Sequence, residues 1–379
     1  MLCKAFPPIT GGVESYSLQV AAAYRRAGAA VTVITQTTGR SGWRELDVNN
    51  GQIIKIFNTG KGGQLATAVK MLARYLVARL QDDFTFVHAT TWRPGIVTLV
   101  IRGIPLVVSA HGRELFRIPR VLRPLMHSVF KRASRVISVS SATLSRAIHA
   151  GIAPEDTGST RRKWMVVGNG LTYTKDQVDA RSVKVGSPLG EVSILTVARL
   201  VERKNIAACI MALAEVHRSG TTTFKYRIAG NGPLLRSLRE LAASTGLGDK
   251  IEALGFVDDA ALEQLYRNCD IFLHPQIDTD GGDDYEGFGI SIADAMAFGA
   301  AVVAGDGSGP SDFVIDGVTG FLVDGRNRSQ LTTRIKNLIE DSELRGRLGH
   351  AAQQHVLSQL SWDRHVRSIL DSLTHNALR

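Results

Sequence analysis

The chain has 379 residues, 44% of them hydrophobic and 21% charged, and a formal net charge of +10 at pH 7. This length and composition indicate a globular protein of about two domains and exclude a fibrous or disordered chain. Three scattered cysteines form no CxxC pair, which argues against a zinc site or a disulfide framework. No apolar run reaches the roughly 18 residues of a membrane span, and the first residues contain no signal-peptide core. We therefore expect a cytoplasmic protein.

The positive charge is concentrated in the first half of the chain. Residues 1–172 contain 23 Lys and Arg against 8 Asp and Glu, a net charge of +15, whereas the remainder has 22 against 27, a net charge of −5. This asymmetry predicts two domains with different partners. The first half should attract an anion, such as nucleic acid, a phosphorylated substrate or an anionic membrane face.

In chain order, the first half alternates short apolar runs with helical patterns. The runs that predict buried strands are 29–35, 84–90, 104–112 and 135–141. Between them, apolar spacing predicts helices over 15–28 and 64–80, the first ended by Gly28 in a C-cap position. Strands alternating with helices predict a parallel sheet covered on both faces.

The same pattern restarts after a polar stretch near residues 172–190. The further strands that it predicts are 192–198, 224–230, 250–257, 270–275 and 299–305. We therefore expect an α/β fold of two doubly wound domains, with ligands at the carboxyl ends of the strands and in a cleft between the domains. The last stretch predicts an amphipathic helix with Ser361 as its N-cap.

The stretch "DYEGFGISIADAMAFGAAVVAG" contains two carboxylates, Glu286 and Asp294, eight residues apart. Eight helical residues rise about 12 Å, which is too far for a catalytic pair acting on one bond. A nucleotide sugar, with hydroxyls at each end and a diphosphate between, matches this separation. Gly287 and Gly289 would let the backbone approach such a ligand at the helix start. The alternative is a loop acid and a solvated helix residue.

A basic loop, "VARLVERKN", follows the predicted strand 192–198. Arg199 could donate hydrogen bonds to two phosphate oxygens at once, and the flexible Lys204 could place its charge beside it. Arg203 could simply be solvated. The alternative interpretation of the whole loop is a solvent-exposed basic surface that binds no ligand.

Two further candidates follow strands of the first half. Gly11 and Gly12, in "FPPITGGVE", precede a helix whose backbone N–H groups could meet phosphate or acceptor, although a plain turn is the alternative. His111, in "VVSAHGREL", follows a strand end and could hydrogen-bond a sugar hydroxyl, although an isolated histidine is more often structural.

Two other motifs could suggest a metal site and a dinucleotide-binding site, and neither is favoured. The D-x-D within "DTDGGDD" could suggest a metal–diphosphate site, but Arg199 and Lys204 already offer the charge neutralisation, so a solvated acidic loop is favoured. The two GNG segments, 168–170 and 230–232, lack the spacing of a GxGxxG fingerprint.

Taken together, the sequence resembles the GT4-type family of retaining glycosyltransferases with the GT-B fold, over nearly the whole chain. The motifs that carry this resemblance, in order, are "FPPITGG", "SAHG", "SVSSAT", "GNG", "ARLVERKN", "IAGNGPL", "LGFV", "LYRNCDIFLHP", "EGFGISIADAMAFG" and "GVTGFLV". The resemblance implies an acceptor-binding domain over 1–172 and a nucleotide-sugar-binding domain over 173–360. It also implies that a C-terminal helix, about 361–379, packs back on the first domain.

The resemblance also implies roles for residues, retention without a protein nucleophile, and no metal or other cofactor. Arg199 and Lys204 would hold the donor diphosphate, Glu286 would face the donor sugar, and His111 the transferred sugar. Further donor contacts would come from Gly11, Gly12, Val257, Phe288, Gly289, Ile290 and Asp294, with Val257 at the base and Asp294 at the ribose.

The sequence departs from the family pattern in three places. Asp294 stands where Glu is usual, so its ribose contact would be long or water-bridged, and Ala198 replaces a common Gly. The chain also leaves barely one short strand before "FPP", whereas a core strand needs about 5–6 residues. We therefore expect a clipped first strand or a start codon placed too far downstream.

The predicted reaction is transfer of a hexose, mannose or glucose, from GDP-mannose or a UDP-hexose in cell-surface polysaccharide or glycolipid synthesis. The acceptor would be a glycan, a polyprenyl-phosphate-linked sugar or a phospholipid. The basic segment 116–136 could lie on the inner face of the cytoplasmic membrane, or be a core-packed helix with a solvated rim.

Three alternatives remain open. One is a sugar-nucleotide epimerase-like enzyme, and another is a non-catalytic GT-B binding protein, suggested by Asp294 and the short N-terminus. A nucleic-acid binder is disfavoured, because the basic stretches show no aromatic interleaving and no recognition motif.

Overall fold

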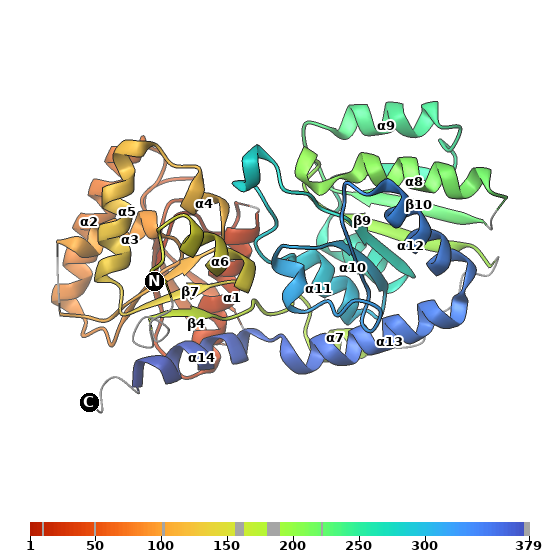
Figure 1. Cartoon of the computed structure of the whole chain (residues 1–379). Coiled ribbons are helices and arrows are strands. Elements are labelled where there is room, and N and C mark those ends of the chain that lie inside the picture. Colours follow the sequence, from red (N-terminus) through yellow and green to blue (C-terminus); the bar gives the residue numbers. More distant parts are fainter. Residues whose placement is uncertain are drawn as a thin grey trace. The chain divides into compact units, whose positions relative to one another are not determined.

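The computed structural model describes residues 1–9, 11–48, 51–100, 103–155, 163–179, 190–220 and 223–374. Two compact units divide the chain, Met1–Gly170 with Ser361–Arg379 and Leu171–Leu360 (Figure 1). Each contains a largely parallel sheet with helices, so the predicted α/β class with two doubly wound sheets is confirmed. Residues 180–189 of the predicted junction, and 375–379 of the predicted last helix, lie outside the described residues.

Across its described residues, the first unit forms an eight-stranded sheet of order β3-β4-β2-β1-β5-β6-β7-β8, antiparallel only between β3 and β4. The strands are β1 (Leu2–Cys3), β2 (Thr32–Thr35), β3 (Gly42–Asp47), β4 (Ile53–Asn58), β5 (Val87–Ala89), β6 (Leu106–Ala110), β7 (Arg135–Ser138) and β8 (Trp164–Val166). β2 and β5 lie on opposite sides of β1, so the sheet winds in both directions from its centre.

The helices of the first unit cover both faces of this sheet. They are α1 (Gly12–Arg26), α2 (Gln64–Gln81), α3 (Trp92–Gly95), α4 (Arg113–Phe116), α5 (Arg123–Arg132), α6 (Ser141–His149) and α14 (Trp362–Thr374), with 3-10 turns η1 (Ile96–Leu99) and η2 (Arg120–Leu122). Successive residues of β6 point to opposite faces of the sheet. Leu106 and Val108 join the core beneath α2, α3 and α5, whereas the Ser109 hydroxyl is hydrogen-bonded to the Tyr16 hydroxyl of α1. The final helix packs on α1.

Both predicted helix caps in this unit are confirmed. α1 ends at Arg26, and Gly28 follows with φ 86°, a left-handed conformation that a side chain would strain. The Ser361 hydroxyl accepts the Arg364 backbone N–H at 3.1 Å, so it satisfies one of the donors that the start of α14 leaves unpaired.

The described part of the second unit holds a six-stranded parallel sheet of order β11-β10-β9-β12-β13-β14. The strands are β9 (Val192–Val197), β10 (Phe224–Ala229), β11 (Ile251–Gly255), β12 (Ile271–His274), β13 (Ala301–Gly305) and β14 (Phe321–Val323). The helices are α7 (Lys175–Asp179), α8 (Ile206–Arg218), α9 (Leu235–Ser244), α10 (Asp259–Arg267), α11 (Ile290–Ala297), α12 (Arg328–Glu340) and α13 (Ser342–Gln359), with 3-10 turns η3 (Glu202–Lys204), η4 (Asp280–Gly282) and η5 (Gly309–Asp312).

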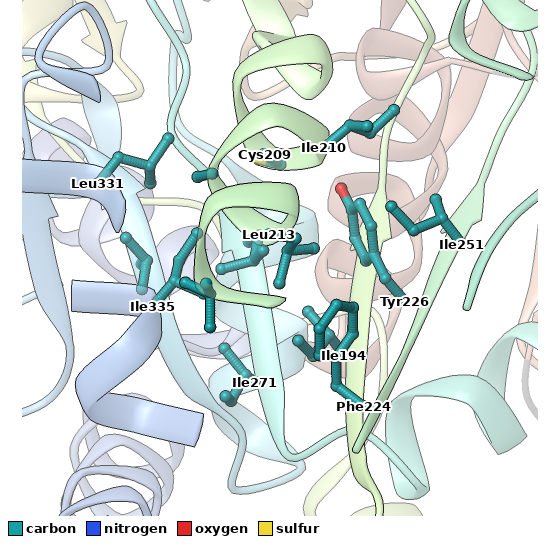
Figure 2. Close-up of a cluster of buried hydrophobic side chains, with 14 of the residues drawn as sticks. Ile194, Cys209, Ile210, Leu213, Phe224, Tyr226, Ile251, Ile271, Leu331 and Ile335 are labelled. Carbon is teal, nitrogen blue, oxygen red and sulfur yellow. The ribbon is translucent and has the colours of Figure 1, made fainter. Parts of the chain in front are cut away.

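The core of the second unit lies between its sheet and α8, α9 and α12. Figure 2 shows Leu213 of α8 between Ile335 of α12 and Tyr226 of β10. Residues alternate along β12, so Ile271 and Leu273 join this core while Phe272 and His274 stack on each other on the opposite face. His274 therefore stands at the carboxyl end of a central strand, on the face away from that core.

The two GNG segments are sites of close backbone packing. A Cβ at Gly230 would lie 1.9 Å from the carbonyl oxygen of Ala198, and one at Gly170 would lie 2.3 Å from the backbone nitrogen of Trp362. Both glycines are therefore required where two backbone segments nearly touch. Close backbone packing therefore accounts for these glycines, and no dinucleotide site is needed to explain them.

Candidate functional site

The second sheet has its topological switch point between β9 and β12. The chain runs from β9 outward to β10 and β11, then returns to β12 on the other side of β9. In doubly wound sheets, ligands bind beyond the carboxyl ends of the strands at such a point. The loops that follow these two strands contain the predicted residues Arg199, Lys204 and Glu286.

Lys204 and Glu286 meet in a buried ion pair, although 82 residues separate them in sequence. The side chain of Arg203 donates to the same carboxylate at 2.9 Å and lies 3.3 Å from the Asp284 carboxylate. The expectation that Arg203 is solvated is therefore wrong, because it completes a cluster of two cations and two carboxylates. Lys204 is 7% exposed and Glu286 9%, so water screens this cluster little.

The charges in this cluster hold one another ionised. Burial alone would raise the pKa of the Glu286 carboxyl, but Lys204 and Arg203 outweigh it and hold that pKa well below its ordinary value. Burial lowers the pKa of the Lys204 ammonium, and the attraction of Glu286 opposes this shift. Glu286 is therefore a carboxylate at neutral pH, and its attraction favours the protonated form of Lys204.

A second network, built on His274, reaches the same lysine. The Lys204 Nζ atom lies 3.1 Å from His274 Nε2, and His274 Nδ1 lies 2.8 Å from Gln276 Oε1. Sequence reasoning missed His274, because "DIFLHP" has the pattern of a buried strand. Its signal was its position as the last residue of a strand at the switch point.

Arg199 differs from the other two cations. It is exposed, and in the part of the chain that the structure describes it makes no ion pair. Its charge is near enough to help lower the pKa of Lys204. The loop after β9 therefore places one unpaired guanidinium beside a charge-balanced buried cluster.

The start of α11 is built from Phe288, Gly289 and Ile290. Gly289 caps the helix with φ 94° and ψ 51°, and a Cβ there would lie 3.0 Å from Pro310. The Phe288 side chain is buried against Phe313, at 5.0 Å between ring centroids. The Phe288 side chain therefore faces the core of the second unit, whereas Ile290 is half-buried.

Asp294 points into the second unit. It is 4% exposed, and one carboxylate oxygen accepts the Thr172 backbone N–H at 2.8 Å. Burial raises the pKa of Asp294 to about 7, and the hydrogen bonds from Thr172 oppose this shift.

Val257 is half-buried in the loop that follows the edge strand β11, at the opposite end of the sheet order from β14.

The first unit contains the remaining predicted residues, near its own switch point between β1 and β5. Gly12 begins α1, and nothing lies within 4 Å of the place where its Cβ would be. The Glu14 carboxylate lies over Gly11, 2.4 Å from the place of a Cβ there. An anion at this helix start would therefore have to share the space with a carboxylate or displace it.

His111 is held from three sides. Its Nε2 donates to the Thr90 carbonyl at 2.8 Å, its backbone N–H donates to the Glu114 carboxylate at 2.6 Å, and its ring meets Tyr16 edge-on at 4.5 Å. Because a carbonyl only accepts, Nε2 carries a proton, and Nδ1 has no hydrogen-bond partner among the residues that the structure describes.

The acidic loop that contains the D-x-D motif follows β12. Over the described residues, no group of three or more His, Cys, Asp or Glu side chains could hold a metal ion. Asp280 and Asp283 are exposed, and Asp284 pairs with Arg203.

Two family models match this chain. "Glycosyl transferases group 1" matches residues 178–355, and "Glycosyltransferase Family 4" matches residues 10–162. A GDP-mannose-dependent alpha-(1-6)-phosphatidylinositol monomannoside mannosyltransferase of Mycolicibacterium smegmatis is 27% identical over 376 residues, covering 96% of this chain and 94% of the relative. An alpha-D-kanosaminyltransferase of Streptomyces kanamyceticus is 25% identical, covering 75% and 73%.

Solved structures share the fold over the whole chain. Sucrose-phosphate synthase from Thermosynechococcus elongatus superposes with a TM-score of 0.79 at 18% identity, covering 100% of this chain and 99% of that one. Anabaena HepE in complex with UDP-glucose gives 0.73 at 21% identity, covering 99% and 100%. With family models on both halves and a relative matched along its length, the chain belongs to the GT4-type glycosyltransferases and has their GT-B fold.

Proposed function

We propose that this glycosyltransferase moves a hexose, with retention of anomeric configuration, from a nucleotide-diphosphate sugar to a glycan or lipid-linked acceptor. The observation that carries the proposal is the cluster at the switch point of the second sheet. There a buried carboxylate, Glu286, is held by Lys204, and the exposed guanidinium of Arg199 follows the same strand. Such a site offers a hydrogen-bond acceptor for sugar hydroxyls and fixed positive charge for phosphate.

The chemistry that this cluster would support is departure of a nucleoside diphosphate. As the bond from the anomeric carbon to the phosphate oxygen breaks, negative charge develops on that oxygen, and Arg199 and Lys204 would stabilise it. The acceptor oxygen would bond the anomeric carbon from the same face and give its proton to the departing phosphate. Because these cations supply the positive charge, we expect transfer to need no metal.

Other residues would bind the rest of the donor. Backbone groups at Phe288, Gly289 and Ile290 would lie along sugar and phosphate, Val257 would meet the base and Asp294 the ribose. In the first unit, His111 would use Nδ1 toward the transferred sugar, and Gly11 and Gly12 would offer backbone N–H groups. Mannose from GDP-mannose is favoured, because the full-length mycobacterial relative is described as GDP-mannose-dependent.

A lipid-linked acceptor would require contact with a membrane, and the first unit has a suitable surface. Residues 48–154 contain 15 Lys and Arg but only three carboxylates, Asp82, Asp83 and Glu114. Leu65 and Leu80 of α2 are 80% and 89% exposed, and Val121 of η2 is 83% exposed. Among the described helices, none is both long and apolar enough to cross a bilayer.

Of the segment 116–136 that the sequence indicates, this surface includes only η2, and it adds α2. Met126, Val129 and Phe130 of α5 are buried in the core, and Arg135 is buried in β7. α2 and α5 both pack against η1. We therefore propose that α2 and η2 together dip into an anionic leaflet, with cations above the headgroups.

Sedimentation with liposomes tests this membrane contact. We expect binding to vesicles with anionic lipid at moderate salt, little binding to neutral vesicles, and several-fold weaker binding of Leu65→Gln and Leu80→Gln. Val318→Gln, at a position 53% exposed in the second unit, is the matched control and should bind as the wild type does. No retention of the wild type on anionic vesicles would rule out the contact.

A donor panel tests the proposed reaction. GDP-mannose, UDP-glucose, UDP-galactose and UDP-N-acetylglucosamine are each added with EDTA, and thermal stabilisation and release of nucleoside diphosphate are measured. We expect one donor to stabilise the protein and to turn over without metal. Conversion of a donor to its epimer without transfer would favour the epimerase-like alternative, and binding without turnover would favour a non-catalytic protein.

A further inference from the structure

His274 is a buried polar residue in an apolar setting. Its side chain is 0% exposed, and its ring stacks on Phe272 with an interplanar angle of 6°. It ends β12, which pairs with β9 on one side and β13 on the other. A buried imidazole needs partners for both ring nitrogens, and those partners define what it can do.

Gln276 fixes the tautomer of this imidazole. The amide nitrogen of Gln276 donates to the Gly305 carbonyl at 2.8 Å and to the Ser308 hydroxyl at 2.9 Å, so the other end of the amide is its oxygen. That oxygen accepts the Gly305 backbone N–H at 3.1 Å and lies 2.8 Å from His274 Nδ1. Nδ1 must therefore carry the proton, and Nε2 presents a lone pair.

The lone pair on Nε2 faces Lys204. The ammonium nitrogen lies 3.1 Å from it and donates a second hydrogen bond to Glu286. Two of the three N–H bonds of Lys204 are then directed by protein groups. Among the described residues, the third N–H has no acceptor.

We infer that His274 is a positioning residue, whose Nε2 lone pair orients the Lys204 ammonium so that its third N–H is left for a phosphate oxygen. This inference rests on the proposed role of Lys204 at the donor diphosphate. Glu286 alone would hold the ammonium at one point and leave it free to rotate. The acceptor on His274 fixes a second direction, and Gln276 and the backbone of Gly305 hold that acceptor in place.

The same contact affects the proton on Lys204. The charged groups that face the ammonium are Glu286, which favours its charged form, and Arg203 and Arg199, which disfavour it. A hydrogen bond from the ammonium to a neutral imidazole also favours the charged form. Loss of the imidazole should therefore let Lys204 lose its proton at lower pH.

The wild-type protein allows a direct test that needs no substrate. In the protein labelled with ¹⁵N-histidine, with His274→Gln used to assign the signal, we expect His274 to be neutral with its proton on Nδ1 at pH 6–8. A proton on Nε2, or an imidazolium in that range, would overturn the inference.

Two variants test the consequence for the reaction. His274→Leu removes the acceptor, whereas His274→Gln returns an amide oxygen close to the place of Nε2. For His274→Leu we expect kcat/KM for the donor to fall roughly 10- to 100-fold and the alkaline limb of its pH profile to move to lower pH. His274→Gln should recover most of both.

Phe272→Leu is the control, because it disturbs the same strand without touching Lys204. It should lower the melting temperature and leave the alkaline limb in place. An equal shift of that limb in Phe272→Leu, or none in His274→Leu, would contradict the positioning role. If no donor turns over with the wild type, the proposed function fails, while the histidine spectra still decide the orientation of the ring.

Discussion

At the scale of single residues, the second unit buries an ion pair where most proteins would bury apolar groups. Removing two charges from water is expensive, and their attraction repays the cost only when further hydrogen bonds complete the site. Here Arg203 and His274 supply those bonds around Lys204 and Glu286. A cluster of this kind is a poor way to gain stability and a good way to hold charges in fixed positions.

The first prediction concerns this pair. Lys204→Met leaves a buried carboxylate with fewer partners, and Glu286→Gln leaves two cations without their shared counter-ion. We expect either change to lower the free energy of unfolding by about 3 kcal/mol. The double variant should lose less than the sum of the two, because neither charge is then left alone. Additive losses in urea unfolding would mean that the two side chains do not interact.

The second prediction concerns pH and Asp294. Burial raises the pKa of its carboxyl from the ordinary 3.8 to about 7 in the folded chain. Between these values the folded chain binds more protons here than the unfolded chain, so stability falls as pH rises and the loss is complete above about pH 7.

Asn at this position cannot ionise but keeps an oxygen for the Thr172 N–H. We expect Asp294→Asn to raise the free energy of unfolding by up to about 4 kcal/mol at pH 8 and to change it little at pH 4. Urea titrations at the two pH values measure the difference. An equal effect at both would show that Asp294 ionises normally.

The sequence predicts residue types at this site better than it predicts contacts. Arg199, Lys204 and Glu286 follow from loops after strands, because strand ends are where doubly wound folds place ligands. The partnership of Arg203 with Glu286 could not be predicted, because 83 residues separate them and either side chain could equally face water. His274 was hidden because one polar residue does not alter the apolar pattern of a buried strand.

At the scale of elements, a glycine after β10 fixes the position of the loop after the neighbouring strand β9, which contains Arg199. Gly230 follows β10 with φ 137°, and the carbonyl of Ala198 occupies the space that a side chain would need. The loops after β9 and β10 are therefore in backbone contact. Any side chain at Gly230 must push the Arg199 loop away from its place.

The third prediction tests this packing. We expect Gly230→Ala to cost about 3 kcal/mol of stability and to weaken donor binding, because the added methyl displaces the 198–200 backbone. Gly346→Ala, at an exposed position in the second turn of α13 with nothing within 4 Å, should instead gain about 0.5–1 kcal/mol. Thermal unfolding with and without donor compares them. A Gly230→Ala protein as stable as the wild type would contradict the close contact.

Most strands could be predicted, because buried parallel strands are short continuous apolar runs. β2, β5, β6, β7 and β9–β13 follow this pattern. The antiparallel pair β3 and β4 was missed, because β3 is an exposed edge strand with the polar sequence "GWRELD". The signal that could have found it is the "NNG" that separates two alternating runs, which is typical of a hairpin turn.

At the scale of the whole molecule, charge and chemistry are divided between the two units. The first carries the excess of positive charge and the exposed apolar side chains of α2, and the second carries the buried charged cluster. This division fits a donor site in one unit and an acceptor that is anionic or embedded in a membrane at the other. The sequence predicts the division from charge alone, and one of its two interpretations of segment 116–136, a core-packed helix with a solvated rim, matches the buried apolar side of α5.

The central claim is that the cluster around Lys204 binds and activates a nucleotide-sugar diphosphate. It is tested most directly by the rate of GDP release from GDP-mannose, with EDTA present, for the wild type and for Lys204→Met shown to be folded. We expect release by the wild type and a loss of roughly 100-fold or more in the variant, because a charge that stabilises the leaving group is gone. Equal rates in the two proteins would contradict the claim and place the chemistry elsewhere.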